Sequence, residues 1–240
     1  MRRLLLVRHA ATSATRAAAF PADEPIEPGA ETLAAGVAGL VGSAATQILA
    51  SPALRCAQTA AAAGLSPQVE PRIAESDFGA WAGRPLAEVH ADDPAAVAAW
   101  MGDPDAAPHD GESLRAFAAR VGGWLDEQAA GDGATLAITH GGVVKAALVH
   151  ALGAPLDAFW RLDVAPLTVT ELHAHDGRWT VSRTNCPLEQ AGRRPGVASG
   201  TGEAHEPAGA AAAASGAARV PGEAHEPAGA AAAASGVARA

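Results

Sequence analysis

Two histidines in this sequence each follow a mostly apolar run and begin a turn into a predicted helix. The run 4–7 ends at Arg8 and His9, and the run 134–139 ends at His140. Short apolar runs are typical of buried strands in parallel sheets, and ligands bind such sheets at the carboxyl ends of the strands. Neutral imidazole is a good nucleophile near pH 7, and the planar fork of arginine binds phosphoryl oxygens. The pattern therefore indicates a pocket for a phosphate.

A third basic residue stands at the start of another predicted helix. The segment 51–60 reads Ser-Pro-Ala-Leu-Arg-Cys-Ala-Gln-Thr-Ala and follows the predicted strand 47–50. Arg55 falls in the first helical turn, where the helix N-terminus and an arginine together favour an anion. The alternative is that Arg55 only caps or solvates the helix. Its neighbour Cys56 is interpreted as a small packed residue.

These segments occur in the order found in the histidine phosphatase superfamily, the phosphoglycerate mutase-like proteins, which the chain resembles over about residues 3–185. The matching segments are the Arg8-His9 box, the stretch 51–60, the loop 75–83 (Glu-Ser-Asp-Phe-Gly-Ala-Trp-Ala-Gly) and the second histidine box 139–143. The resemblance implies that His9 attacks phosphorus and becomes phosphohistidine. It also implies that Arg8 and Arg55 bind the phosphoryl oxygens.

The resemblance assigns two further roles. Glu75 matches the general acid, which protonates the leaving oxygen and, once deprotonated, activates water for the second step. Asp77 is the rival carboxylate, but its position in the motif is variable and it is interpreted as an exposed loop residue. His140 is expected to donate a hydrogen bond to a phosphoryl oxygen in the transition state, assisted by the backbone N–H of Gly141.

Other residues near these boxes have weaker assignments. Ala10 stands where the family usually has glycine, and its methyl group is expected to narrow the approach of substrate. Thr15 replaces a frequent asparagine, and its hydroxyl is expected to bind a phosphoryl oxygen. Glu112 is a candidate for substrate contact, and His109 is placed at the pocket rim or on the surface. Lys145 is expected to be exposed or bridging.

The elements that must position these residues alternate between strand and helix. Strands are expected at 3–7, 47–50, 68–73 and 134–139, with a hairpin of 169–174 and 179–184 about Asp176-Gly177; helices are expected at 31–41, 54–63, 85–90, 94–101, 113–128 and 143–152; loops are expected at 10–28 and 74–83. This order predicts an α/β fold, a three-layer α/β/α sandwich with a mostly parallel central sheet. The segment 85–110 is expected to form a cap over the pocket.

The last part of the chain differs in composition. A 20-residue repeat begins at Gly202 and again at Gly222, and it is rich in Ala, Gly and Pro. Such segments cannot bury a core, so residues 1–190 are predicted to form the phosphatase-like domain and 191–240 a disordered tail. Deleting the tail after Gly200 is expected to leave fold and turnover intact.

Composition narrows the function classes. The net charge of −9 disfavours nucleic acid and anionic membrane surfaces as partners. Two cysteines are too few for a disulfide framework, and the expected location is the cytoplasm. His9 and His140 lack the spacings of a zinc site, so no metal or cofactor is expected. The expected partner is a small phosphorylated substrate; the oligomeric state stays open.

Three functions remain in competition. A phosphomonoester hydrolase is favoured over a phosphoglycerate mutase, because mutases carry extra basic residues in the middle region whereas residues 84–112 contain only Arg84. The short middle insertion most resembles phosphatases of the α-ribazole phosphatase type. A catalytically idle phosphate-binding module is the third hypothesis, and the retained acid at Glu75 argues against it.

Overall fold

A computed structural model describes residues 2–41 and 45–191 of the chain, so the predicted tail and the effect of its deletion fall, apart from residue 191, outside the described residues. In chain order the elements are β1 (Arg2–Arg8), α1 (Ser13–Ala17), α2 (Ala30–Ala34), the 3-10 helix η1 (Ala35–Leu40), β2 (Ala45–Ala50), α3 (Leu54–Ala62), β3 (Gln68–Val69), η2 (Pro71–Ile73), η3 (Gly79–Trp81), α4 (Leu86–Asp92), α5 (Pro94–Gly102), α6 (Leu114–Ala129), β4 (Gly133–Thr139), α7 (Gly141–Ala151), η4 (Leu156–Arg161), β5 (Thr168–His175), β6 (Arg178–Pro187) and α8 (Leu188–Ala191).

The described strands form one sheet in the order β3-β2-β4-β1-β5-β6. β1 and β2 pair in parallel on either side of β4, and β3 pairs in parallel with β2. β5 runs antiparallel to β1 and forms the predicted hairpin with β6, whose turn residues Asp176 and Gly177 have φ of 50° and 73°. The mostly parallel sheet with an antiparallel end is confirmed.

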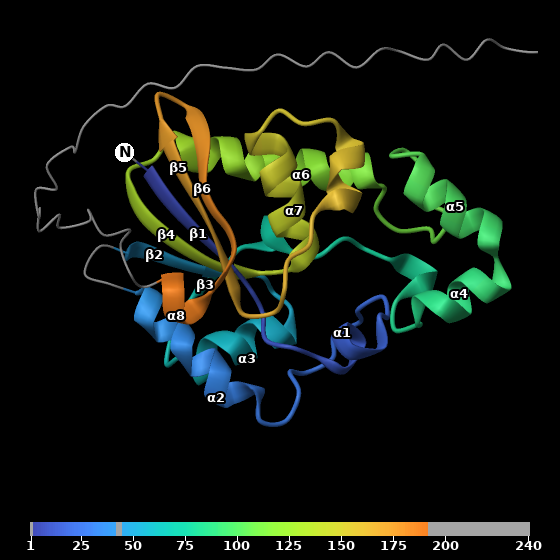
Figure 1. The fold of residues 1–240 in the computed structure, drawn as a ribbon, viewed down its shortest axis with the longest axis horizontal. Helices are drawn as coiled ribbons and strands as arrows, with labels where there is room; N and C mark the ends of the chain where they lie inside the picture. Colours follow the sequence, from blue (N-terminus) through green and yellow to red (C-terminus); the bar gives the residue numbers. More distant parts are fainter. Residues whose placement is uncertain (1, 42–44, 192–240) are drawn as a thin grey trace, which may run out of the picture. The chain divides into compact units, whose positions relative to one another are not determined.

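Helices cover both faces of this sheet (Figure 1). Leu4 and Leu6 of β1 pack in one cluster with the apolar faces of α6 and α7. Their neighbours Leu5 and Val7 point to the opposite face, in a second cluster with residues of α3 and η1. Because side chains alternate along a strand, one apolar run serves both cores, and the predicted three-layer sandwich is confirmed.

The predicted amphipathic helix is α6. Its apolar stripe is buried as the 3.6-residue period requires, at Leu114, Phe117, Val121, Trp124 and Leu125. Ser113 caps the helix, since its side chain accepts a hydrogen bond from the backbone N–H of Ala116 at 3.2 Å. α6 packs beside α7, so it supports the helix that begins at His140.

Several boundaries differ from the sequence expectation. The helix expected at 31–41 becomes a 3-10 helix from Ala35, where Gly36 and Gly39 lower helix propensity. The strand expected at 68–73 ends at Val69, because Pro71 cannot donate a ladder hydrogen bond. The loop at 10–28 contains the short helix α1. α8 and η4 had no clear signal in the sequence pattern.

The cap predicted at 85–110 contains α4 and α5, which lie to one side of the sheet in Figure 1. It has its own apolar cluster of Phe20, Trp81, Val89 and Val97, with Phe78 and Trp100 packed against them.

Among the described residues, no helix combines the length and the apolar character needed to span a membrane.

Candidate active site

The parallel pairing of β1 and β4 brings the two histidine boxes together. The pairing aligns Arg8 with Thr139, and the backbone N–H of His9 donates to the carbonyl of Thr139 at 2.9 Å. His140 directly follows β4 and is the N-cap of α7. The imidazole rings of His9 and His140 are consequently 5.2 Å apart between centroids, at an interplanar angle of 67°. Both rings are buried.

The hydrogen bonds of His9 identify its neutral tautomer. Nδ1 lies 2.7 Å from the carbonyl oxygen of Ala10, so Nδ1 carries the proton and donates it. Nε2 is therefore unprotonated, and its lone pair accepts a hydrogen bond from Nε of Arg55 at 3.2 Å. Burial, together with the charges of Arg55 and Arg8, lowers the pKa of His9 to about 3, against the opposing effect of the Ala10 bond. The ring is thus neutral near pH 7.

Arg55 lies between the two histidines. It is 3 % exposed, in the first turn of α3, and its Nη2 lies 3.1 Å from Nδ1 of His140. Its Nη1 donates to the carbonyl of Ala22 at 2.8 Å and is 3.9 Å from the carboxylate of Glu24. A buried guanidinium in the first turn of a helix is a positive group suited to an anion.

His140 has both ring nitrogens engaged. Because Arg55 can only donate, Nδ1 of His140 accepts, and Nε2–H donates to the hydroxyl of Ser51 at 2.6 Å. Burial, followed by the charge of Arg55, lowers the pKa of His140 well below its ordinary value. The ring is neutral, and its expected hydrogen bond to a phosphoryl oxygen requires it to exchange one of these partners.

Arg8 lies at the end of β1, and its guanidinium includes a buried donor. Its Nη1 bonds the carbonyl of Val164, while its Nε is buried without a hydrogen-bond partner among the described residues. Nε also lies 3.4 Å from the position that a Cβ would take on Gly141. A buried donor without a partner costs free energy, so this atom favours an incoming acceptor.

Glu75 approaches the start of α7. Its Oε1 accepts from the N–H of Ser76 at 3.1 Å, and its Oε2 accepts from the N–H of Gly142 at 3.3 Å. Burial raises the pKa of this carboxyl, and the two hydrogen bonds and the charges of Arg55 and Arg8 oppose that rise. A carboxyl with a raised pKa keeps its proton to higher pH, which is what a general acid needs.

Asp77 is placed differently. It is exposed, and its Oδ1 accepts from the backbone N–H of Gly79 at 2.9 Å. This is the local bond of an Asx turn, and it agrees with the interpretation of Asp77 as a loop residue.

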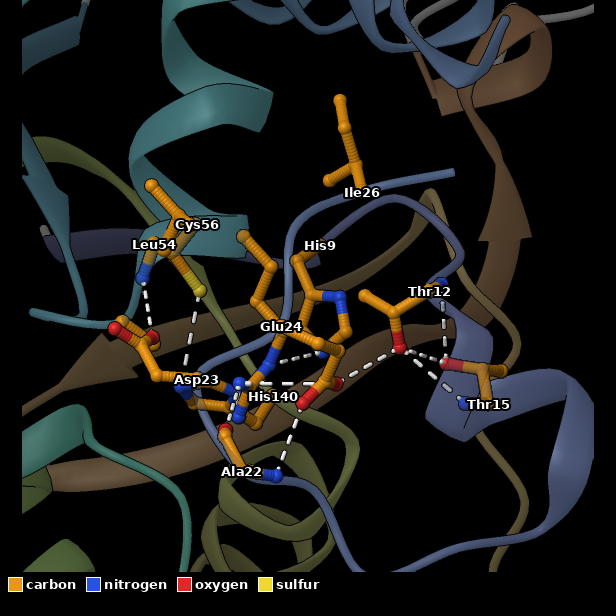
Figure 2. A network of polar contacts seen from close by, with 12 residues as sticks. His9, Thr12, Thr15, Ala22, Asp23, Glu24, Ile26, Leu54, Cys56 and His140 are labelled. Carbon is orange, nitrogen blue, oxygen red and sulfur yellow. Dashed lines mark hydrogen bonds and ion pairs between the residues drawn. The ribbon is translucent and has the colours of Figure 1, made fainter. Parts of the chain in front are cut away.

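Thr15 belongs to a helix cap. Figure 2 shows it joined to Thr12, and Thr12 joined to Glu24. The hydroxyl of Thr12 donates to Glu24 at 3.0 Å, so it accepts from the hydroxyl of Thr15 at 3.1 Å. Thr15 thus ends a chain of polar contacts that leads through Glu24 to Arg55. The phosphate contacts expected of Thr15 and Gly141 stay predictions.

Two of the weaker assignments are corrected by the structure. Ala10 is fully buried in an apolar cluster with Ile26 and Ala34, so its methyl group faces a core. His109 is fully buried against the rings of Phe78 and Trp81 in the cap. The reason in both cases is packing between segments distant in sequence.

Glu112, the candidate for substrate contact, has an ion-pair partner, and its contact with substrate stays a prediction. It pairs with Arg120 at 2.6 Å between Nη2 and Oε2. Arg120 in turn donates to the carbonyls of Arg72 and Ala74 at 2.8 and 3.0 Å and to that of Glu75 at 3.4 Å. Sequence reasoning missed Arg120, since it lies on the polar side of an amphipathic helix. Arg120 fixes the backbone that carries Glu75.

A cavity of about 320 Å³ opens onto this cluster. Its lining includes Ser51, Arg55 and Glu75, with Ala22 and Asp23 from the loop that follows α1. Asp23 also accepts from the N–H of Leu54 at 2.8 Å, so it tethers that loop to the start of α3. Cys56 is buried as expected, with its Sγ 3.7 Å from Nε2 of His140. The described residues hold no group of three or more His, Cys, Asp or Glu able to bind a metal.

Known proteins share this sequence pattern and this fold. The histidine phosphatase superfamily (branch 1) matches residues 4–187. A bifunctional protein of Mycobacterium tuberculosis is 34 % identical over 146 residues, which are 58 % of this chain and 40 % of that protein. The chain thus spans less than half the length of this curated relative.

Two solved structures are similar. A mycobacterial glucosyl-3-phosphoglycerate phosphatase in complex with inorganic phosphate is 27 % identical, with a TM-score of 0.68, and the match covers 79 % of this chain and 99 % of that one. A putative α-ribazole-5′-phosphate phosphatase of Escherichia coli shares the fold at 24 % identity and a TM-score of 0.67, covering 78 % of this chain and 98 % of that one. The resemblance stated from the motifs is confirmed: this chain belongs to the histidine phosphatase superfamily.

Proposed function

We propose that the chain hydrolyses small phosphomonoesters through a phosphohistidine on His9, with Glu75 as general acid and base and without a metal. The observation that carries the proposal is the state of His9. Its Nε2 is unprotonated, and its lone pair points at the guanidinium of Arg55. Arg55 and Glu75 both line the adjacent cavity. A neutral imidazole beside an anion-binding group is the arrangement that nucleophilic attack on phosphorus requires.

Binding comes first in this reaction. A phosphoryl dianion offers Arg55 stronger, charge-assisted hydrogen bonds than a neutral imidazole does, so it takes over the bond between Arg55 and His9. Nε of Arg8, which has no hydrogen-bond partner in the described part of the chain, supplies a second donor. When Arg55 turns to the phosphoryl oxygens, Nδ1 of His140 is released, and a proton there would make that ring the third donor.

Chemistry then proceeds in two displacements. Nε2 of His9 forms a bond to phosphorus as the P–O ester bond breaks, and Glu75 gives its proton to the departing oxygen. Water next attacks the phosphohistidine, Glu75 takes a proton from that water, and the P–N bond breaks to release inorganic phosphate. The first step leaves phosphohistidine and a deprotonated Glu75, the second step restores both groups, and neither step needs a metal ion.

Hydrolysis is favoured over phosphoryl transfer by the cap. Arg84, the one arginine or lysine at 84–112, pairs with Asp92. A mutase needs cationic side chains that hold a carboxylated, twice-phosphorylated intermediate in place, and Arg84 is already engaged. A small phosphorylated metabolite is the proposed substrate, and the cytoplasm is the proposed location.

The test is a panel of phosphomonoesters assayed with and without a chelator. We expect release of inorganic phosphate from several esters, unchanged by the chelator, and no conversion of 3-phosphoglycerate to its isomer. Isomerisation faster than hydrolysis would establish the mutase instead. Tight phosphate binding without turnover of any ester would establish the idle binding module.

A further inference from the structure

A second cavity lies next to the one that holds the proposed phosphate site. Its volume is about 170 Å³, and the two cavities share Glu75 and Ser76 in their linings. Five aromatic side chains line the second cavity, namely Phe78, Trp100, Phe117, Phe159 and Trp160. The carboxyl of Glu75 therefore stands between a polar compartment and an apolar one.

The aromatic lining comes from three helices and from Phe78 in the loop before η3. Trp100 belongs to α5 in the cap, Phe117 to α6, and Phe159 and Trp160 to η4. Trp100 meets Trp160 edge to face with centroids 4.7 Å apart, and Trp160 meets Phe159 in the same way at 5.1 Å. Such pairs hold their rings in defined orientations. The wall is thus built between the cap and the helices of the main domain.

One cationic side chain is part of this mostly apolar lining. Lys145, the single lysine of the chain, lies one helical turn after Gly142 on α7 and lines the cavity. It is half-buried, where the sequence suggested an exposed or bridging residue. Its ammonium sits 5.3 Å from the centre of the Phe159 ring, and no hydrogen bond or ion pair joins it to another residue in the described part of the chain. Its three donors are available to an acidic group.

We propose that this second cavity binds the leaving group of the ester, and that the leaving group is a ring-sized apolar moiety with an acidic substituent that contacts Lys145. The inference rests on the proposed phosphatase function. The size fits, because an apolar cavity of roughly 150 Å³ accommodates one benzene ring. The position fits as well, since the ester oxygen joins phosphate to leaving group, and Glu75 stands at that junction.

The first test compares Trp100→Ala with Met101→Ala, its exposed neighbour on α5. Both variants are assayed on phenyl phosphate, 3-carboxyphenyl phosphate and glycerol phosphate. Trp100→Ala should lower kcat/KM for the aryl esters by about tenfold more than for glycerol phosphate, because contacts in an apolar pocket discriminate by roughly 10–200-fold per methylene. Met101→Ala should treat all three alike. Equal losses on all three esters in Trp100→Ala would overturn the assignment.

The second test uses Lys145→Met, with Arg178→Met as a control that removes an exposed charge elsewhere. Lys145→Met should lower kcat/KM for 3-carboxyphenyl phosphate by about tenfold more than for phenyl phosphate, the scale of one hydrogen bond to a charged group. Arg178→Met should not change the ratio of the two esters. An unchanged ratio in Lys145→Met would overturn the role of the amine.

Binding of the leaving group alone separates this inference from the phosphatase function. 3-Hydroxybenzoate should bind the wild-type protein in calorimetry and quench its tryptophan fluorescence, and Trp100→Ala and Lys145→Met should each weaken that binding. If the wild type turns over no ester yet shows this binding pattern, the phosphatase function fails and the subsite stands. If esters are hydrolysed but 3-hydroxybenzoate does not bind at millimolar concentration, the subsite fails and the phosphatase function stands.

Discussion

Replacing Gly142 by alanine should displace the carboxyl of Glu75 without damaging the fold. A Cβ at position 142 would lie 2.2 Å from Oε1 of Glu75 and 3.0 Å from its Cδ. The φ of Gly142 is not positive, so α7 accepts alanine there. The atoms in conflict are the far end of a flexible side chain, and the backbone of α7 can stay in place. The clash is therefore relieved by movement of the proposed acid.

The size of the effect follows from this contact. Restoring an ordinary separation between Cβ and Oε1 moves the carboxyl by about 1 Å, and a displacement of that size costs on the order of 10²-fold in rate. We expect kcat/KM to fall by about that factor on alkyl phosphates, which need protonation of the leaving oxygen. p-Nitrophenyl phosphate should lose much less, because its leaving oxygen hardly needs a proton.

The control is Gly123→Ala on the exposed side of α6, where an added Cβ meets no atom of the described residues within 4 Å. That change should leave kcat/KM unaltered and stabilise the helix by about 1 kcal/mol. Thermal unfolding of Gly142→Ala should match the wild type within a few degrees. Wild-type turnover of alkyl phosphates by Gly142→Ala would contradict the placement of Glu75 as the acid.

Three further perturbations test the site. Arg55→Lys should lower kcat/KM through a loss of about 2–4 kcal/mol of transition-state stabilisation, because the point charge of lysine cannot replace the preorganised fork of arginine. Full activity of this variant in a phosphatase assay would refute a bidentate role for Arg55. In the wild type, kcat/KM should decline as pH rises through the raised pKa of Glu75, because only the protonated carboxyl acts as general acid. Glu75→Gln should abolish this decline, whereas Asp77→Asn should keep it. Arg120→Lys should slow alkyl phosphates more than p-nitrophenyl phosphate, because the loop carrying Glu75 loses its carbonyl contacts; equal losses would indicate a purely structural role.

The strand ends were predictable from the sequence because one local pattern specifies them. The apolar residues of β1 and β4 place both strands in the interior of the sheet, and His9 and His140, which directly follow these parallel strands, must then lie at the same edge. Arg55 was predictable for the same reason, as it lies in the first turn of the helix after β2. The hydrogen bonds among His9, Arg55 and His140 could not be predicted, because the protonation state and rotamer of each side chain depend on the other two.

The environments of three residues beside the motifs could not be predicted, for a different reason. Ala10, His109 and Glu112 were interpreted from their places beside motifs, yet their environments are set by segments far away in the chain. His109 is enclosed by Phe78 and Trp81, and Glu112 is captured by Arg120. Local periodicity carries no information on such contacts. The same holds for Lys145, whose burial depends on η4, an element with no clear signal in the sequence.

The central claim is that His9 carries the phosphoryl group between the two steps. Rapid acid quenching during turnover of labelled substrate, followed by peptide mapping, tests it most directly. We expect an acid-labile, base-stable phosphoenzyme with the label on His9, absent in His9→Ala, which should also lose turnover. Near-wild-type turnover by His9→Ala, or a label on any other residue, would contradict the mechanism.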